Sequence, residues 1–322
     1  MMNDTPLVSI ITPSFNQAAF LEETINAVLS QDYPAIEYWI IDGGSTDGSL
    51  EIIKRYAHKL RGWVSEKDAG QADAINKGLR QAGGEILAWI NSDDLYRPGA
   101  ISSAVTSLQV NPEVGQVYSD VDSIDVEGET FNRMRYGHWQ LADLMAFNVI
   151  GQASVFFRRS VLEQAGYLDP SYHYLLDHQL WLRMACVTQL KYVPGEVWAA
   201  ARMHAGAKNV AEGEGFGQEA YRLVAWMQAD ARFRPYLQDQ MHRVWAGAHR
   251  LNAFYLLDSG KPGEALRAYW RGLWKHPPTV LKDWRRILFA LLSPLGIDRL
   301  RTRYIDRRKR RFSQGENKIV EG

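Results

Sequence analysis

Two adjacent carboxylates follow an apolar segment in the stretch WINSDDLY. Residues 86–90 are apolar, and the run ends at Asn91, Ser92, Asp93 and Asp94. A carboxylate at the end of a buried strand loses water and needs a partner. A solvated turn would supply one. So would Mg²⁺ or Mn²⁺, which prefer oxygen ligands and can use one or two carboxylates together with phosphate oxygens. The stretch therefore predicts either a polar turn or a metal–phosphate site.

Three more polar clusters follow apolar runs in the same manner. They are Thr12-Pro13-Ser14 after 8–11, Asp42 after 38–41, and Asp68 after 63–64. Between the runs, apolar residues recur at helical spacing in 20–29, 50–56 and 72–81. Alternating strands and helices predict an α/β fold with a mostly parallel sheet flanked by helices. Ligands bind at the carboxyl ends of such strands, so the four clusters are expected to line one cleft. Each cluster alone could equally be an ordinary turn.

Composition narrows the class of protein. The 322 residues contain 37 Lys+Arg and 37 Asp+Glu, which gives no global charge that would point to nucleic acid. The single cysteine, Cys186, permits no internal disulfide and favours a reducing cytosol. The N-terminus lacks the pattern of a signal peptide. No apolar run approaches the ~20 residues that a membrane-spanning helix needs.

The alternation of strands and helices weakens beyond Asp120. A strand is predicted at 155–157, and helices are predicted at 159–165 and 175–186. From about Gly217 onward the pattern is almost entirely helical, with turns at Gly260 and at Pro277-Pro278. We therefore predict two domains, a catalytic domain at 1–215 and a helical region at 216–322.

Three ordered segments resemble family 2 glycosyltransferases, which have the GT-A (Rossmann-like) fold. They are VSIITPSFNQAAFLEETINAVLSQDYPAIEYWIIDGGSTDGS, SEKDAGQADAINKGLRQAGGEILAWINSDDLY and GYLDPSYHYLLDHQLWLRM. The resemblance covers roughly residues 6–205 and rests on several motifs in order. It implies a bacterial-type, non-processive hexosyltransferase that uses a UDP-, GDP- or dTDP-linked sugar and Mg²⁺ or Mn²⁺, and that inverts the anomeric carbon.

The resemblance also assigns roles to residues on the donor side. It places Thr12, Pro13, Ser14 and Asp42 at the base, Asp68 and Asn76 along the donor, and Asn91, Ser92 and Asp93 at the DXD positions. Asp93 is the expected metal ligand, and His204 is similarly placed to a residue that closes over the metal or diphosphate. Two positions depart from the family pattern. Asn91 replaces an Asp, and Gly43 stands where many relatives have a second acid.

The third segment supplies the catalytic base that the resemblance implies. Asp177 aligns with the family's base, although Leu176 stands where relatives often have Glu. A lone Asp at a helix start can also be a cap, and His178 is a rival base. Gln152 and Trp181 are expected to contact the acceptor, although a Trp at this helical spacing is also typical of a core.

The helical end carries two further patterns. LNAFYLLDSGKPGEALRAYWRGLWKHPP resembles a single tetratricopeptide repeat, which would form a helical hairpin. Residues 280–292 form an amphipathic, Trp-bearing helix, and a basic stretch from Arg299 to Arg311 follows. This composition is typical of a helix on an anionic membrane surface. A helix packed on the core and followed by a solvated tail is the alternative.

These patterns together predict a metal-dependent inverting glycosyltransferase. It would add a single sugar to a hydroxyl of a glycan or lipid-linked acceptor during cell-surface polysaccharide synthesis. We expect it in the cytoplasm, peripherally on the inner face of the plasma membrane. A processive synthase would need membrane spans and a Gln-x-x-Arg-Trp motif, and a nucleotidyltransferase would need a Gly-rich first loop in place of TPSFNQ. A non-catalytic nucleotide-sugar-binding or scaffold protein remains open because of Asn91 and Leu176.

Overall fold

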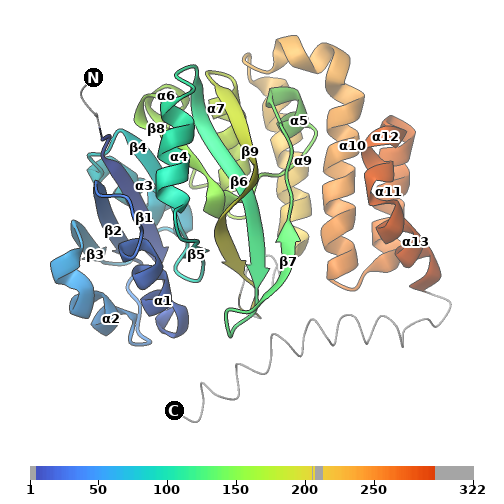
Figure 1. Ribbon diagram of the computed structural model, residues 1–322. Helices are drawn as coiled ribbons and strands as arrows, with labels where there is room; N and C mark the ends of the chain where they lie inside the picture. Colours follow the sequence, from blue (N-terminus) through green and yellow to red (C-terminus); the bar gives the residue numbers. More distant parts are fainter. Residues whose placement is uncertain (1–4, 205, 207–212, 294–322) are drawn as a thin grey trace. The chain divides into compact units, whose positions relative to one another are not determined.

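The structure, a computed structural model, describes residues 5–204, 206 and 213–293 (Figure 1). The chain divides into two compact units. The first comprises the chain up to 124 together with 128–139 and 150–202, and the second comprises 125–127, 140–149 and the chain from 203 onward. The functional boundary near residue 215 stays a prediction.

A mixed sheet forms the centre of the first unit. Its strands are β1 (Val8–Ser14), β2 (Ile36–Asp42), β3 (Gly62–Ser65), β4 (Ile86–Trp89), β5 (Leu95–Tyr96), β6 (Val114–Ile124), β7 (Thr130–Met134), β8 (Phe156–Arg158) and β9 (Gln189–Arg202). The strand order is β3-β2-β1-β4-β8-β6-β9-β5, and β7 pairs with β6. The four strands from β3 to β4 are parallel, as β6 and β9 are, whereas β8 runs antiparallel to both of its neighbours. This arrangement confirms the predicted α/β fold.

Helices cover both faces of this sheet. They are α1 (Ala18–Leu29), α2 (Ser49–Tyr56), α3 (Gln71–Gln81), α4 (Ala100–Gln109), α6 (Arg159–Ala165) and α7 (Leu176–Ala185). Successive strand residues point to opposite faces. Ile10, Ile40 and Ala88 therefore share one apolar cluster with residues of α1 and α4. On the other face, α3 approaches closely at Gly78, where a Cβ atom would lie 2.5 Å from Ile11.

Two long strands, β6 and β9, were not predicted from the sequence. Strand β9 contains Pro194-Gly195, a pair that usually marks a turn. Its pairing with β6 moves from Tyr118↔Tyr192 to Asp120↔Val197, so residues 193–196 form a bulge that absorbs the pair. The predicted strand at 155–157 is found as β8, one residue later at each end.

The second unit is helical, as the predicted fold required. Its helices are α5 (Leu141–Met145), α9 (Gly213–Ala229), α10 (Arg234–Asp258), α11 (Pro262–Lys275), α12 (Pro277–Val280) and α13 (Trp284–Leu292). Small buried residues, among them Ala246, Ala253 and Ala268, let these helices pack closely. Among the described residues, no helix is both long and apolar enough to cross a membrane.

Candidate active site

The four polar clusters meet at one edge of the sheet. Strand pairing places Ser14 beside Asp42 and Asp42 beside Ser65. The N–H of Ile90, just after β4, donates to the carbonyl of Ile11 at 2.9 Å. The loops that follow β1, β2, β3 and β4 are therefore neighbours at the carboxyl ends of parallel strands (Figure 1).

Asp42 organises the loop after β2. Its side chain is fully buried. One carboxylate oxygen accepts hydrogen bonds from the N–H groups of Gly44 (3.1 Å) and Ser45 (3.0 Å) and from the Ser65 hydroxyl (2.7 Å). The other oxygen accepts from the Ser45 hydroxyl. The carboxylate thus ties the β2 loop to β3, and its predicted contact with a base stays a prediction.

The β1 cluster is also buried. The hydroxyls of Thr12 and Tyr38 are 3.0 Å apart in the core, and Pro13 is buried beside them. Among the described residues, the buried Ser14 hydroxyl has no hydrogen-bond partner. The next residue, Phe15, is 60% exposed. The sequence interpretation overlooked this ring, although a large aromatic residue directly after a strand end was a signal that could have found it.

Asp68 explains one departure from the family pattern. Its carboxylate accepts a hydrogen bond from the N–H of Gly70 at 2.8 Å. A Cβ atom on Gly43 would lie 2.6 Å from the other carboxylate oxygen and 3.3 Å from the Phe15 ring. A side chain at residue 43 would therefore require the Asp68 side chain to shift.

Asn91 to Asp94 form a closed turn after β4. The N–H of Asp94 donates to the carbonyl of Asn91 at 3.1 Å, and the Asn91 amide donates to the Asp94 carboxylate at 3.1 Å. Gln71 donates to the Asn91 side-chain oxygen at 2.8 Å. Ser92 is buried within the turn. The Asn91 side chain, which replaces the family's carboxylate, thus donates through its nitrogen and accepts through its oxygen.

The two carboxylates of this turn differ in environment. Asp94 is only 6% exposed and accepts the N–H of Arg202, in β9, at 2.9 Å. Burial, and then the charge of Asp93, raise the pKa of Asp94 well above its ordinary value. Asp93 is partly exposed, and its carbonyl accepts from the Arg202 guanidinium at 3.1 Å. Asp94 therefore stabilises the turn, and Asp93 is the acid that can face a ligand.

The donor set at this edge suits a hard cation that a phosphate accompanies. Within the described ranges, no group of three or more His, Cys, Asp or Glu side chains could hold a metal by itself. Mg²⁺ commonly uses one or two carboxylates and completes its shell with phosphate oxygens and water, and Asp93 fits that requirement. His204 belongs to the second compact unit, and its role as a metal ligand stays a prediction.

Asp177 lies in the first turn of α7. Trp181, one turn later, is fully buried and stacks on Trp89 with ring centroids 5.2 Å apart. Residues four apart share a helix face and are separated by about 6 Å along the axis. Asp177 is therefore one helical turn from a ring that contacts the last residue of β4. His178 is fully buried, and this disfavours it as the rival base.

Asn76 of α3 bonds to a segment far along the chain. It is buried, and its amide donates to the carbonyl of Leu168 at 2.9 Å while accepting the N–H of Leu168 at 3.0 Å. Arg183 of α7 donates to the carbonyls of Ala165 (2.6 Å) and Tyr167 (2.7 Å) in the same segment. Asn76 thus connects α3 to the segment before α7, and its predicted place along the donor stays a prediction.

The two predicted acceptor residues have different surroundings. The Gln152 amide donates to the carbonyl of Trp89 at 2.7 Å, which places its side chain at the end of β4. Trp181 offers no exposed surface to an acceptor in this structure, because its indole packs between Trp89 and Phe157. Its observed contacts are those of a core residue that supports β4.

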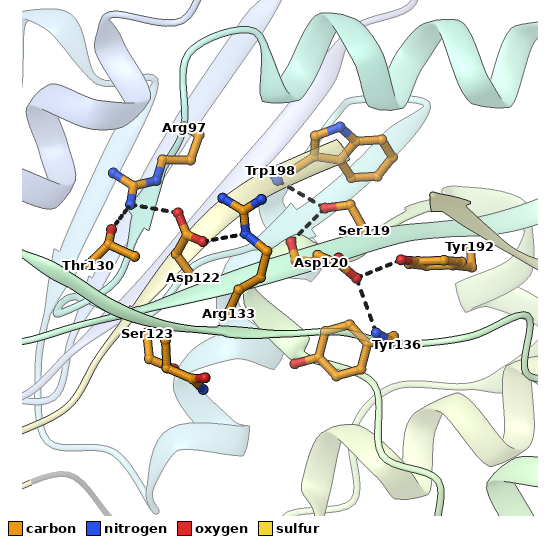
Figure 2. Close-up of polar contacts among 11 residues, drawn as sticks. Arg97, Ser119, Asp120, Asp122, Ser123, Thr130, Arg133, Tyr136, Tyr192 and Trp198 are labelled. Carbon is orange, nitrogen blue, oxygen red and sulfur yellow. Dashed lines mark hydrogen bonds and ion pairs between the residues drawn. The ribbon is translucent and has the colours of Figure 1, made fainter. Parts of the chain in front are cut away.

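The sequence interpretation missed a network on β6, shown in Figure 2. Asp120 accepts hydrogen bonds from the Tyr192 hydroxyl (2.7 Å) and the Tyr136 N–H (3.1 Å). Asp122 accepts from Arg97 and from Arg133, each at 2.9 Å. Burial raises the pKa of Asp122, but these two guanidinium groups more than offset it and hold that pKa below its ordinary value.

Strand register relates this network to the turn after β4. Leu87 pairs with Phe157, and Phe157 pairs with Gln116. Four residues beyond each partner, Asn91 and Asp120 therefore lie toward the same edge of the sheet. The Asp120 network therefore lies on the strand next to β8, toward the edge where the turn after β4 lies.

Comparisons with known proteins agree with this geometry. Residues 9–165 match the model of Glycosyl transferase family 2. An uncharacterized glycosyltransferase of Rickettsia typhi is 30% identical over 210 residues, which cover 62% of this chain and 65%, just under two thirds, of that protein.

Two solved structures share the fold. TarS 1-349 of S. aureus, in complex with UDP-GlcNAc, has a TM-score of 0.58 at 16% identity, over 85% of this chain and 82% of that one. The mannosyltransferase PcManGT of Pyrobaculum calidifontis, in complex with GDP-Man and Mn²⁺, has a TM-score of 0.58 at 23% identity, over 91% and 88%.

Proposed function

We propose, because this chain belongs to glycosyl transferase family 2, that it moves a single sugar from a nucleotide-diphosphate-sugar donor to an acceptor hydroxyl. The observation that carries the proposal is the sheet edge, where the loops after four parallel strands are neighbours. Phe15 and Asp68 both lie against Gly43 there, and Asp93 lies in the loop after β4. The ligands of TarS and PcManGT, UDP-GlcNAc and GDP-Man, support a donor of this class.

The nucleobase would bind beside Phe15. That ring is 60% exposed and lies next to Gly43, on the loop that Asp42 holds in place. Stacking of a base on an aromatic ring contributes about 1–3 kcal/mol and is tolerant of base identity. A UDP, GDP or dTDP donor therefore remains compatible with this position.

The diphosphate would lie at the turn after β4, with Asp93 as a ligand of the cation and His204 as a second. A bound Mg²⁺ or Mn²⁺ neutralises charge on the departing nucleoside diphosphate. The protein's own contribution is to hold Asp93 in place, through the buried Asp94 and its bond to Arg202 in β9.

Asp177 would act as the general base. Its carboxylate takes the proton of the acceptor hydroxyl while that oxygen bonds to the anomeric carbon. The bond from that carbon to the diphosphate breaks on the opposite face, and the nucleoside diphosphate leaves with the electron pair. Such a displacement inverts the anomeric carbon. The Asn76 and Arg183 contacts keep α7, and with it Asp177, in position.

The acceptor would be a glycan or a lipid-linked sugar for cell-surface polysaccharide synthesis, with Gln152 at its site. We place this work in residues 1–215, with 216–322 as an accessory helical region. The protein would act in the cytoplasm, at the inner face of the plasma membrane.

Donor turnover by the purified chain tests the proposal. We expect release of nucleoside diphosphate from one member of a panel of UDP-, GDP- and dTDP-sugars with Mn²⁺. Asp93→Asn should abolish it, whereas Asp239→Asn, an exposed acid of α10, should not. Tight donor binding without turnover or transfer would contradict an enzyme and favour a non-catalytic nucleotide-sugar binder.

A further inference from the structure

Exposed apolar side chains are concentrated in the last described helices. Seven of the twelve large apolar side chains that are exposed in the described residues lie between 270 and 292. They are Trp270, Trp274, Leu281, Trp284, Leu288, Leu291 and Leu292. Scattered single exposures are normal, but a cluster of this kind marks an interaction site.

Helix α13 is amphipathic with its apolar side outward. Its inner face buries Ala290 against the core formed with α10 and α11. Its outer face presents Trp284, Leu288 and Leu291, which are 55%, 47% and 54% exposed. Spacings of four and three residues place these side chains on one face. A helix of an isolated globular unit would present polar residues there.

Helix α11 presents a similar outer face. Ala265, Ala268, Tyr269 and Gly272 are its buried residues. Trp270 and Trp274 point the other way, with ring centroids 5.8 Å apart. Exposed cations also lie on α11, namely Arg267, Arg271 and Lys275, with Glu264 as the acid at its start.

The charges near α13 are sorted between its two sides. Asp283, the one acid in 281–292, accepts from Arg250 (3.5 Å) and from the Tyr269 hydroxyl (3.2 Å) on the inner side. Arg286 also turns inward, to Asp258 at 2.7 Å. Arg285 is exposed and lies over the Trp284 ring, 5.3 Å from its centroid. The outer face of α13 therefore combines Trp284, leucines and Arg285 without a carboxylate.

We propose that the outer faces of α11 and α13, named here the Trp–Arg surface, dock on an anionic lipid bilayer. Its members are Arg267, Trp270, Arg271, Trp274, Lys275, Leu281, Trp284, Arg285, Leu288, Leu291 and Leu292. Tryptophan favours the headgroup boundary, and cations near it attract anionic lipid. The basic stretch Arg299–Arg311 lies outside the described residues, but by sequence residues 294–322 add nine Lys and Arg against four acids.

An anionic bilayer fits this surface better than a second copy of the chain does. Two copies that met face to face would bring Arg285 and the α11 cations against like charges. Only the purpose of docking, to bring the site to a lipid-linked acceptor, rests on the proposed function. Docking itself involves none of the donor-site residues.

Vesicle co-sedimentation of the full chain tests the inference. We expect binding to phosphatidylcholine vesicles that contain phosphatidylglycerol at low salt, and weaker binding at high salt because of screening. The double change Trp284→Gln with Leu288→Gln should weaken partitioning by at least about tenfold, since two apolar groups that docking would bury in the bilayer are lost. Tyr236→Gln, which removes an exposed aromatic of α10, is the matched control.

A second double variant tests the inference if the first one misfolds. Arg271→Glu with Arg285→Glu should weaken binding to anionic vesicles, whereas Lys54→Glu on α2 should not. Equal binding by wild type and both double variants would overturn the inference. So would a wild-type dimer that the Gln variants dissociate, because a second copy would then cover this surface. Calorimetry with nucleoside diphosphate, run in parallel, shows separately whether the donor site binds.

Discussion

The sheet edge and the Trp–Arg surface break the usual burial rule in opposite directions. At the sheet edge, the carboxylates of Asp42 and Asp94 are buried at 0% and 6% exposure. On the Trp–Arg surface, Trp274 and Trp284 are 75% and 55% exposed. Acids are seldom buried without a partner, and large apolar groups seldom cluster in water.

The two exceptions differ in what compensates for the burial of the acids and for the exposure of the tryptophans. The buried acids accept hydrogen bonds from the protein itself, as Asp42 does from Gly44, Ser45 and Ser65. The sheet edge is thus organised before any ligand arrives, which is what a catalytic site requires. The exposed tryptophans of the Trp–Arg surface bury little of their area in the fold. Changes at the sheet edge should therefore impair catalysis or stability. Changes on the Trp–Arg surface should impair membrane binding alone.

Asp177→Asn should have the largest effect on the sheet-edge side of the comparison. Loss of a general base typically costs about 10²–10⁴-fold in rate. Donor binding should persist, because the role proposed for this carboxylate is to take a proton from the acceptor. Single-turnover transfer and calorimetry with donor would separate the two effects. Near-normal turnover by this variant would assign the base role to another residue.

Asp93→Asn should weaken metal-dependent donor binding. The loss should reach at least the ~10–100-fold that removal of a supporting group costs a metal site. The neighbouring Asp94 should not compensate, because its carboxylate is buried and bonded to Asn91 and Arg202. Titration of donor with and without Mn²⁺ measures the change. Unaltered Mn²⁺-dependent affinity would remove Asp93 from the metal site.

Asp42→Ala should lower both stability and nucleotide affinity. It leaves the partly buried donors of Gly44, Ser45 and Ser65 without an acceptor, and an unsatisfied buried group costs about 1–3 kcal/mol. Affinity should fall equally for free nucleoside diphosphate and for the sugar-bearing donor, because we place the base beside the loop that Asp42 shapes. Thermal unfolding and calorimetry check the two parts. A loss confined to the sugar-bearing donor would place Asp42 at the sugar.

Leu288→Gln should have the smallest effect, and it sharpens the contrast. Leu288 is 47% exposed, so the change should alter the free energy of unfolding by no more than about 0.5 kcal/mol. Leu257, buried at 6% exposure in α10, is the control, and truncation to Ala there should cost about 2–5 kcal/mol. A large loss of stability in Leu288→Gln would mean that the fold needs this side chain.

The parallel half of the fold was predictable because its signals are local. Each of β1, β2 and β4 is an apolar run that ends in a polar cluster, and the helices between them show apolar spacing. Strands β6 and β9 pair over long range, and the bulge that accommodates Pro194-Gly195 depends on that pairing. No local pattern encodes it.

The site was predictable in residue identity more than in role. Asn76 was named, but its partner Leu168 lies 92 residues away, so the sequence could not show that the amide holds the turn before α7. Trp181 was named as an acceptor contact, and only packing shows that its ring supports Trp89. Phe15 was missed although it directly follows a strand end, but the sequence could not show that its ring lies beside Gly43, which comes from another loop.

Thermal unfolding with a panel of nucleoside diphosphates tests most directly whether the sheet edge binds a nucleotide donor. A ligand that binds the folded state stabilises it by about 2.7 kcal/mol at one hundred times its Kd. We predict that one of UDP, GDP or dTDP raises the Tm of wild type with Mn²⁺, that EDTA reduces the shift, and that Asp93→Asn loses it while Asp239→Asn keeps it. No shift with any nucleoside diphosphate, with or without Mn²⁺, would contradict the account.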